Sequence, residues 1–386
     1  MPKIAILQGN RLSSWHMEMY ARLNSKYELT AFVPPDNIFP LDEIPIPYKV
    51  IPYENETGSL LHRKQINLKY RREHSSHGFE IPMAGLDDAL AEFDLIHTWE
   101  TFTHWTESAL KAKRKYGVPV LVTVWDNIPF DAETLEIPAS IKKRALDESD
   151  SFLVYTRVSR KMLRLEGITP GRLKTVLPGV DIEKFRYRKP NPKIIEELEI
   201  EPDDGIILYV GRLVWEKGIF DLIHAIAELN RYDKTGKLKL LVVGEGPIKK
   251  ELAARAEKCR VSVQFLGKKE YKDLPDIYNC SNIIAAPSIP TKIWQEQFCM
   301  ALIEGMACGL PGIVSTSGGL PEILGEGGIS VPPQDYISLA EAIEKILGNK
   351  ETYLKYSKLA RERVEEVFNV DSNAEIMENI YSELSR

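Results

Sequence analysis

The sequence predicts an α/β protein with two doubly wound parallel sheets, one in each half of the chain, and three observations carry this prediction. The 386 residues exceed what one hydrophobic core usually holds and suffice for two domains. Short apolar runs rich in valine and isoleucine alternate with helical stretches in both halves, as in sheets covered on both faces. Between the halves, residues 186–192 are rich in charge and proline, as linkers between domains are. We therefore predict domains over residues 1–185 and 186–371.

Composition and charge exclude several classes of protein. Hydrophobic residues make up 44% of the chain and charged residues 27%, which is ordinary for a globular protein. A net charge of −6 and a pI of about 5.8 give no electrostatic basis for binding nucleic acid. No run of 18 apolar residues could span a membrane, and the first predicted strand starts at Lys3, which leaves no room for a signal peptide. Because the four cysteines lack disulfide or metal spacing, we expect a cytoplasmic protein.

The first turn of the chain is a candidate ligand site. A strand over residues 3–8 leads through Gly9 and Asn10 into a helix from about residue 13, and such a turn lies at the carboxyl edge of a doubly wound sheet, where ligands bind. Gly9 is equally well explained as a structural glycine in a tight turn. Trp15 and His16 follow on the new helix, where they either face a ligand or simply pack.

Polar residues also gather after two later strands of the first half. Beyond strands over residues 28–33 and 48–51, the run 94–99 contains His97 and precedes His104, and the run 118–124 ends at Trp125 and Asp126. Side chains just past strand ends build the site of a doubly wound domain, so these four residues are candidate ligand contacts. Each histidine alone is also consistent with a structural role. A strand over 151–156, a helix over 157–166 and a strand over 174–177 complete this half.

One segment of the first half is locally basic in an acidic protein. We predict a helix there, and its basic residues are His62, Arg63, Lys64, Lys69, Arg71 and Arg72. A solvated helix face explains such a segment, and contact with anionic lipid or with an acidic acceptor explains it as well.

In the second half, two cations flank one turn between a strand and a helix. A strand over residues 206–210 leads through Gly211 and Arg212 to Lys217 and a helix over 219–230. The two cations and the unpaired amides of the helix start can converge on one anion. Strands over 238–243, 261–266 and 282–286 continue the alternation, with helices starting after residue 247 and over 274–278.

Residues 287–324 predict a loop, a helix, a buried strand and a second helix. The helix over 298–307 follows Glu296, contains Glu304 and is ended by Gly309 and Pro311. Helix starts at 298–300 and 318–320, on either side of a strand over 312–315, offer amides to anions, and the two carboxylates can bind sugar hydroxyls. The stretch therefore predicts a site for a sugar that carries phosphates. A strand over 328–331 and helices over 336–347, 351–367 and 372–384 follow.

This stretch resembles the donor-site signature of glycosyltransferase family 4, a large group of retaining sugar transferases. The usual signature has a glutamate before Phe-Gly, a second glutamate eight positions after the first, and then Ala-Met-Ala-x-Gly-x-Pro. Here Cys299 replaces the glycine and Gly305 replaces the first alanine. Residues 211–218 resemble the Gly-Arg-Leu-x-x-x-Lys-Gly element of the same family, and residues 178–185 resemble its exit from the first domain.

The resemblance implies the GT-B fold, in which two doubly wound, Rossmann-like domains face each other across a cleft. The domain over residues 1–185 would bind the acceptor, and the domain over 186–371 would bind a nucleotide-sugar donor. The last helix, over 372–386, would complete the first domain.

The resemblance also implies roles for residues of this chain. Arg212 and Lys217 would stabilise the departing nucleotide diphosphate, Glu296 would bind sugar hydroxyls, and these three are predicted to be catalytic. The predicted donor contacts are Gly9, Asn10, Gly211, Phe298, Cys299, Met300 and Glu304, the last of these at the ribose. Candidate sugar or acceptor contacts are Trp15, His16, His97, His104, Trp125 and Asp126. We expect a UDP- or GDP-linked sugar as substrate, no cofactor and, without an Asp-x-Asp motif, no metal.

The acceptor is expected to be a carbohydrate, a polyol or a lipid-linked molecule, and peripheral contact with the inner membrane face is one option. Many family members have a histidine where this chain has Trp125, so His97 or His104 would have to supply an imidazole if one is needed. A glycosidase that used the two glutamates would leave Arg212 and Lys217 without a role. A sugar-nucleotide epimerase on the same scaffold would need no acceptor, and a sugar- or nucleotide-binding protein would not turn over at all.

Overall fold

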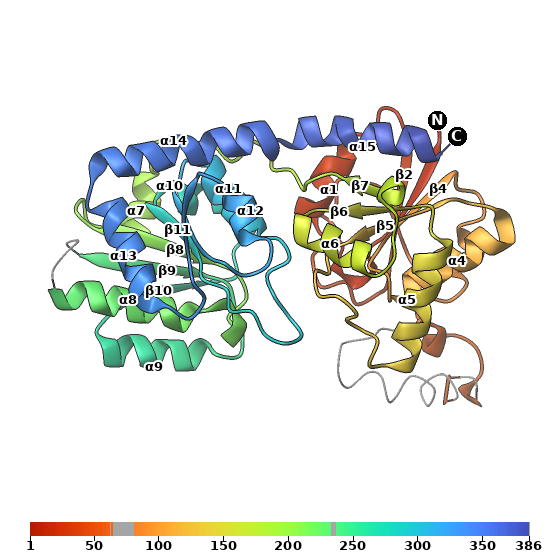
Figure 1. Cartoon of the computed structure of the whole chain (residues 1–386), viewed down its shortest axis with the longest axis horizontal. Helices are drawn as coiled ribbons and strands as arrows, with labels where there is room; N and C mark the ends of the chain where they lie inside the picture. The colour runs from red at the N-terminus through yellow and green to blue at the C-terminus, as the bar shows by residue number, and fades with distance from the viewer. Residues whose placement is uncertain (62, 65–80, 233–236, 386) are drawn as a thin grey trace. The chain divides into compact units, whose positions relative to one another are not determined.

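The computed structural model describes residues 1–61, 63–64, 81–232 and 237–385, which form two compact units (Figure 1). One unit comprises Met1–Gly179 with Val370–Arg386, and the other comprises Val180–Asn369. The sequence places the boundary after residue 185, whereas the units divide after residue 179. Residues 182–185 fall in the second unit, where the carbonyls of Ile182 and Phe185 accept hydrogen bonds from Arg361.

The first unit contains a seven-stranded sheet in the order β3-β2-β1-β4-β5-β6-β7, with parallel neighbours. Its strands are β1 (Lys3–Leu7), β2 (Glu28–Val33), β3 (Tyr48–Val50), β4 (Leu95–Trp99), β5 (Val120–Val124), β6 (Ser151–Val154) and β7 (Leu173–Thr175). Its helices are α1 (Ser14–Ala21), α3 (Leu86–Ala89), α4 (His104–Tyr116), α5 (Glu136–Glu148), α6 (Arg157–Leu165) and α15 (Val370–Leu384), and its short 3-10 turns are η1 (Gly9–Arg11), η2 (Glu54–Glu56) and η3 (Pro170–Arg172).

Helix α15, the end of the chain, packs on α1 of this unit. Ion pairs join Arg22 to Asp371 at 2.8 Å and Lys26 to Glu378 at 2.6 Å. The ring of Tyr381 lies inside the unit, because its hydroxyl contacts the His97 Nδ1 at 2.7 Å. Strands β4 and β5 are buried along their whole length, as expected for central strands of a sheet with helices on both faces.

The second unit contains a six-stranded parallel sheet in the order β10-β9-β8-β11-β12-β13. Its strands are β8 (Gly205–Val210), β9 (Leu238–Val243), β10 (Ser262–Gly267), β11 (Ile283–Ala286), β12 (Gly312–Ser315) and β13 (Gly328–Val331). Its helices are α7 (Pro192–Glu197), α8 (Ile219–Tyr232), α9 (Lys249–Cys259), α10 (Leu274–Asn279), α11 (Met300–Ala307), α12 (Leu320–Leu324), α13 (Tyr336–Leu347) and α14 (Lys350–Val367), with a 3-10 turn η4 (Trp215–Lys217).

Helices cover both faces of this second sheet. Helices α8, α9 and α13 lie on one face and α10, α11 and α14 on the other (Figure 1). The first face is closed by a buried cluster that includes Leu222, Ile226, Leu240 and Ile343. Two doubly wound parallel sheets are thus present, which confirms the predicted fold class.

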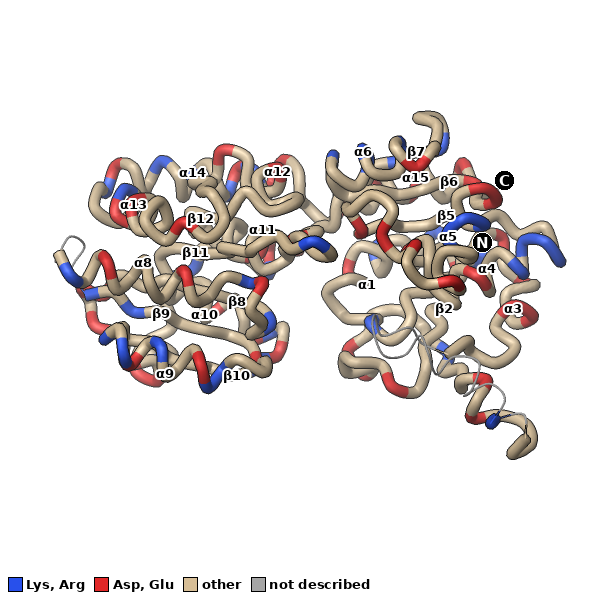
Figure 2. The backbone as a smooth tube through the Cα atoms, turned by 60° about the horizontal axis from the view of Figure 1, so that its bottom comes forward, with Lys and Arg blue, Asp and Glu red and all other residues tan. Residues whose placement is uncertain are grey.

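Lys and Arg are interspersed with Asp and Glu along both units (Figure 2). The basic segment predicted over residues 62–72 lies outside the described residues, apart from Arg63 and Lys64. Of the helices that the structure describes, none combines the length and apolar character needed to cross a bilayer.

Candidate functional sites

Lys217 and Glu296 form an ion pair at the carboxyl edge of the second sheet. The Lys217 Nζ lies 2.9 and 2.6 Å from the two carboxylate oxygens of Glu296, and both side chains are largely buried. The hydroxyl of Ser288 donates to Glu296 Oε2 at 2.6 Å. Because an ammonium has three N–H donors, Lys217 can hold this carboxylate and an additional anion together.

The turn that carries Lys217 is docked against the loop before Glu296. The turn ends at Gly218, which has a φ of +70°. A Cβ at this position would lie 1.9 Å from the carbonyl oxygen of Pro287, so only glycine permits the approach. The amide of Ile289 donates to the carbonyl of Glu216 at 2.7 Å, which fixes the two loops together. The ion pair therefore rests on a rigid backbone contact.

Arg212 differs from Lys217 in being exposed. Its carbonyl accepts a hydrogen bond from the Tyr209 hydroxyl at 2.7 Å, which fixes the backbone after Gly211. Its guanidinium makes no hydrogen bond or ion pair with another residue in the described part of the chain. Burial raises the pKa of Tyr209 well above its usual range, and the charge of Glu296 adds to this, so the phenol stays a donor. Arg212 thus presents an exposed cation that no other described residue engages.

The second glutamate, Glu304, is buried on α11. The hydroxyl of Tyr278 on α10 donates to Glu304 Oε2 at 2.7 Å. Burial raises the pKa of Tyr278 well above its ordinary value, with the carboxylate of Glu304 adding to the effect. Tyr278 therefore holds one oxygen of Glu304. Its role was not predicted, although the helix over residues 274–278 was.

The predicted donor contacts Phe298, Cys299 and Met300, at the start of α11, differ in how their side chains are packed. Phe298 is buried, and its ring centroid lies 6.0 Å from that of Phe368, so its side chain belongs to the core. Helix α11 begins at Met300, two residues later than predicted, after Cys299 as N-cap. The pKa of the Cys299 thiol is raised to about 12 by burial and then by Glu296, so it stays protonated.

Both departures from the family signature have a structural explanation. Cys299 has a φ of −120°, an extended backbone open to any residue, so glycine is not required there. At Gly305 a Cβ would lie 3.0 Å from the Cβ of Ile284 on β11, which is tighter than ordinary contact. Glycine at 305 therefore lets α11 lie close to the sheet.

In the first unit, the turn after β1 is packed against an aromatic ring. Gly9 has a φ of +64°, and a Cβ there would lie 2.4 Å from the indole of Trp105. The Trp105 indole in turn donates to the carbonyl of Trp99 at 2.8 Å. The carbonyl of Asn10 accepts from the amide of Ile38 at 2.8 Å. These contacts show a tight structural turn at Gly9, and its predicted part in donor binding stays a prediction.

His16 is the imidazole that lies beside Trp125. Their ring centroids are 4.7 Å apart, and the ring of Trp15 lies 3.4 Å from that of His16, tilted by 35°. The His16 Nδ1 lies 3.0 Å from the amide nitrogen of Gln8 and 3.0 Å from the hydroxyl of Ser13. Burial and the charge of Arg11 hold the pKa of His16 well below its ordinary value. The ring is therefore neutral, and its Nε2 has no hydrogen-bond partner among the described residues.

His97 does not fit its predicted role as a sugar or acceptor contact. It is fully buried, and its two ring nitrogens lie 2.7 Å from the Tyr381 hydroxyl and 2.6 Å from the Thr123 hydroxyl. Burial lowers its pKa to about 3, so it stays neutral. Both ring nitrogens are engaged inside the unit, which makes His97 a core histidine. His104 is also buried, in the first turn of α4.

Glu100 and Asp126 lie together at the ends of β4 and β5. The Glu100 carboxylate accepts from the amides of Trp125 at 3.0 Å and of Asp126 at 3.3 Å. Burial raises the pKa of Glu100 to about 8, and the charge of Asp126 adds to this. Burial also raises the pKa of Asp126 to about 6. Glu100 was not predicted as a site residue, although its position just past a strand end was a usable signal.

No group of three or more His, Cys, Asp or Glu side chains that could hold a metal ion occurs within the described ranges. The four cysteines, all of them in the described part, are free thiols.

Two family models match adjacent parts of the chain. "Glycosyltransferase Family 4" matches residues 23–184, and "Glycosyl transferases group 1" matches residues 190–363. A curated relative, D-inositol 3-phosphate glycosyltransferase 2 of Catenulispora acidiphila, is 29% identical over 280 residues, which are 66% of this chain and 62% of that protein. The glycogen synthase of Mycobacterium tuberculosis is 27% identical over 239 residues, 61% of this chain and 54% of the relative. The matched region thus spans under two thirds of these relatives.

Solved structures extend the likeness to the whole fold. The crystal structure of Anabaena HepE in complex with UDP and glucose has a TM-score of 0.78 at 18% identity and is covered over 100% of both chains. Sucrose-phosphate synthase from Thermosynechococcus elongatus has a TM-score of 0.73 at 22% identity and is covered over 100% of this chain and 99% of its own.

The two parallel sheets and these structural neighbours define the GT-B class of glycosyltransferase fold. Within that class, the chain belongs to glycosyltransferase family 4.

Proposed function

We propose that this protein transfers a sugar from a nucleotide-diphosphate sugar to an acceptor hydroxyl with retention of anomeric configuration. One observation carries the proposal: the exposed Arg212 guanidinium and the Lys217–Glu296 pair stand at the two ends of one turn at the carboxyl edge of the second sheet. Cations and carboxylate so arranged match a diphosphate joined to a sugar. A glycosidase would leave both cations without a role.

The chemistry follows from where charge develops. Cleavage of the glycosyl–phosphate bond gives cationic character to the sugar and negative charge to the leaving diphosphate. Arg212 and Lys217, with the amides at the start of α11, stabilise that leaving group, and the stabilisation is largest in the transition state. Glu296, whose carboxylate is already held by Lys217 and Ser288, accepts from sugar hydroxyls, and Glu304 accepts from the ribose. The leaving phosphate takes the acceptor proton, so no protein nucleophile is required.

The substrate classes are proposals as well. We assign the donor as a UDP- or GDP-linked sugar, and the Anabaena neighbour solved with UDP and glucose supports UDP. The nucleotide sugar is a substrate, and neither a cofactor nor a metal is invoked. The relatives named for D-inositol 3-phosphate and for glycogen support a polyol or a carbohydrate acceptor, and a lipid-linked acceptor is the third class. Residues around His16, Trp125 and Asp126 supply the acceptor contacts in the first unit.

The test is binding and turnover of a nucleotide panel by the full-length protein. We expect UDP- or GDP-glucose to raise the melting temperature of the wild type, because a ligand that binds only the native state stabilises it by mass action. Release of the nucleoside diphosphate, measured by a coupled assay with and without sugar acceptors, then separates a transferase from a binding protein. Formation of an epimeric sugar nucleotide would instead indicate an epimerase, and absence of any nucleotide binding would refute the donor site.

We also propose a cytoplasmic location with peripheral membrane contact through Leu60, Leu61, Arg63 and Lys64. Leu60 and Leu61 are 76% and 74% exposed, and Arg63 and Lys64 follow them, a combination that binds anionic lipid surfaces.

Co-sedimentation with vesicles tests this contact. Vesicles of phosphatidylcholine with about 30% anionic phosphatidylglycerol should carry down the wild type but leave most of a Leu60→Ser/Leu61→Ser variant in solution. Leu354→Ser, which alters a 55% exposed leucine on α14, is the control and should bind as the wild type does. Equal sedimentation of all three proteins would contradict the proposal.

A further inference from the structure

Glu100 and Asp126 place two carboxyl groups close together in the first unit. Resting on the proposed function, we infer that this pair selects uncharged hydroxyl groups of the acceptor and rejects phosphorylated ones. The occupant is therefore a neutral polyol or sugar ring.

The backbone of Glu100 is held in an unfavourable conformation by contacts with neighbouring elements. Glu100 has a φ of +61°, a left-handed conformation that is costly for a residue with a side chain. Its amide donates to the carbonyl of Thr123 at 2.8 Å, and its carbonyl accepts from the Thr106 hydroxyl at 2.7 Å. Contacts from β5 and α4 thus impose the strained conformation. Strain of this kind persists mainly at functional sites.

The carboxylates are fixed by backbone amides. Glu100 accepts from the amides of Trp125 and Asp126, as described above. Asp126 Oδ1 accepts from the amides of Asn127 at 2.7 Å and Ile128 at 3.1 Å. Neither carboxylate is neutralised by an ion pair in the described part of the first unit. The nearby charge that acts on Glu100 besides Asp126 is that of Arg11, whose side chain is exposed.

The neighbours of the pair complete a site for hydroxyl groups. The His16 ring is neutral and its Nε2 has no partner among the described residues, and the indoles of Trp15 and Trp125 provide apolar surface beside it. Carboxyl oxygens, an imidazole nitrogen and aromatic faces suit the hydroxyls and C–H surface of a sugar or polyol. A phosphate monoester carries nearly two negative charges at neutral pH, so the two carboxylates repel it.

The experiment compares matched neutral and phosphorylated probes. Dissociation constants of myo-inositol and D-myo-inositol 3-phosphate, and of glucose and glucose 6-phosphate, are measured by ligand-observed NMR with the full-length protein at pH 8. We expect the neutral member of each pair to bind about tenfold more tightly to the wild type. Glu100→Gln should reduce that ratio several-fold, whereas Glu136→Gln, which removes an exposed glutamate from α5, should preserve it.

The pH dependence of the preference for the neutral probe tests whether the charge of Glu100 acts on the ligand, because a purely structural Glu100 would produce no such dependence. Between pH 7 and pH 9 a phosphate monoester is already dianionic and His16 stays neutral, while the Glu100–Asp126 pair, whose pKa values are raised by burial, loses its remaining proton. Preference for the neutral probe should therefore rise with pH in the wild type and stay constant in Glu100→Gln.

Three outcomes would overturn the inference. They are equal or tighter binding of the phosphorylated probes by the wild type, an unchanged ratio in Glu100→Gln, and no binding of either neutral probe. Binding of UDP and GDP is measured on the same samples. If nucleotide binding is present and the ratio does not respond, this inference alone fails, whereas absence of nucleotide binding removes the proposed function.

Discussion

Replacing Arg212 with alanine should lower the rate of sugar transfer about 10²–10³-fold, the typical cost of removing one donor that stabilises developing charge. The guanidinium is exposed and bonds to no other described residue, so its contribution goes to a bound anion. For the same reason, the free energy of unfolding should change by less than about 0.5 kcal/mol. Initial rates of nucleoside diphosphate release and urea unfolding measure the two quantities.

Two further variants make this result specific. Arg231→Ala removes a 70% exposed arginine from the end of α8 and should leave the rate unchanged. Lys217→Ala should lower both the rate and the stability, because it leaves the buried carboxylate of Glu296 without its cation. Full activity of Arg212→Ala would refute the proposed grip on the diphosphate.

The elements of the fold were largely predictable because both halves alternate apolar runs with helical ones. The structure has β9 at residues 238–243, β13 at 328–331 and α13 at 336–347, with the predicted bounds. Helix α5 was not predicted, since Pro138 in its first turn and a mixed polar pattern obscure it. A proline is tolerated there because the first amides of a helix have no partner within the helix.

Sequence patterns indicated residues of the sites but not how those residues pair. Lys217 and Glu296 are 79 positions apart, and their ion pair depends on the contact of Gly218 with Pro287, which no local pattern contains. The imidazole beside Trp125 is that of His16, whereas the sequence patterns indicated His97 or His104 as substitutes. Alternation identifies buried positions on a strand but cannot show that His97 meets Tyr381 of the last helix. The left-handed backbone of Glu100 is likewise invisible in the sequence.

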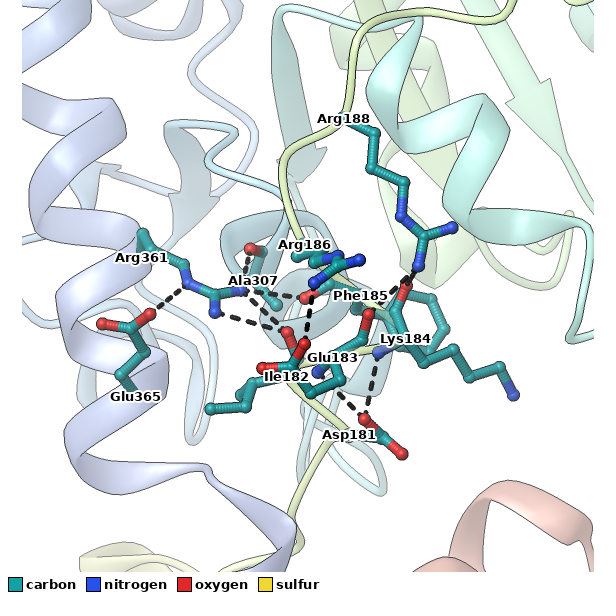
Figure 3. A network of polar contacts seen from close by, with 10 residues as sticks. All are labelled: Asp181, Ile182, Glu183, Lys184, Phe185, Arg186, Arg188, Ala307, Arg361 and Glu365. Atoms are coloured by element: carbon teal, nitrogen blue, oxygen red, sulfur yellow. Dashed lines mark hydrogen bonds and ion pairs between the residues drawn. The ribbon is translucent and has the colours of Figure 1, made fainter.

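Replacing Arg361 with alanine should lower the free energy of unfolding of the second unit by about 2–4 kcal/mol, a large effect for one residue. Arg361 projects from α14 toward residues 182–185 (Figure 3). Its guanidinium donates to the carbonyls of Phe185 at 2.9 Å and Ile182 at 3.3 Å, and to that of Ala307, at the end of α11, at 2.7 Å. One side chain thus joins residues 182–185 to the helix that carries Glu304. Its loss leaves three carbonyls without a charged donor.

The segments that become less stable in Arg361→Ala show whether Arg361 joins two segments or only contributes a charge. Hydrogen exchange should speed up in residues 182–188 and at the end of α11 in Arg361→Ala, because both segments lose their shared donor. Arg361→Lys should have an intermediate effect, since an ammonium lacks the planar fork that serves two segments together. Lys358→Ala, which removes a 75% exposed cation one turn earlier, should behave as the wild type does. If Arg361→Ala has the same free energy of unfolding and the same hydrogen exchange as Lys358→Ala, residues 182–185 are held by apolar contacts rather than by the arginine. Phe185, which is buried in the unit, would then supply those contacts.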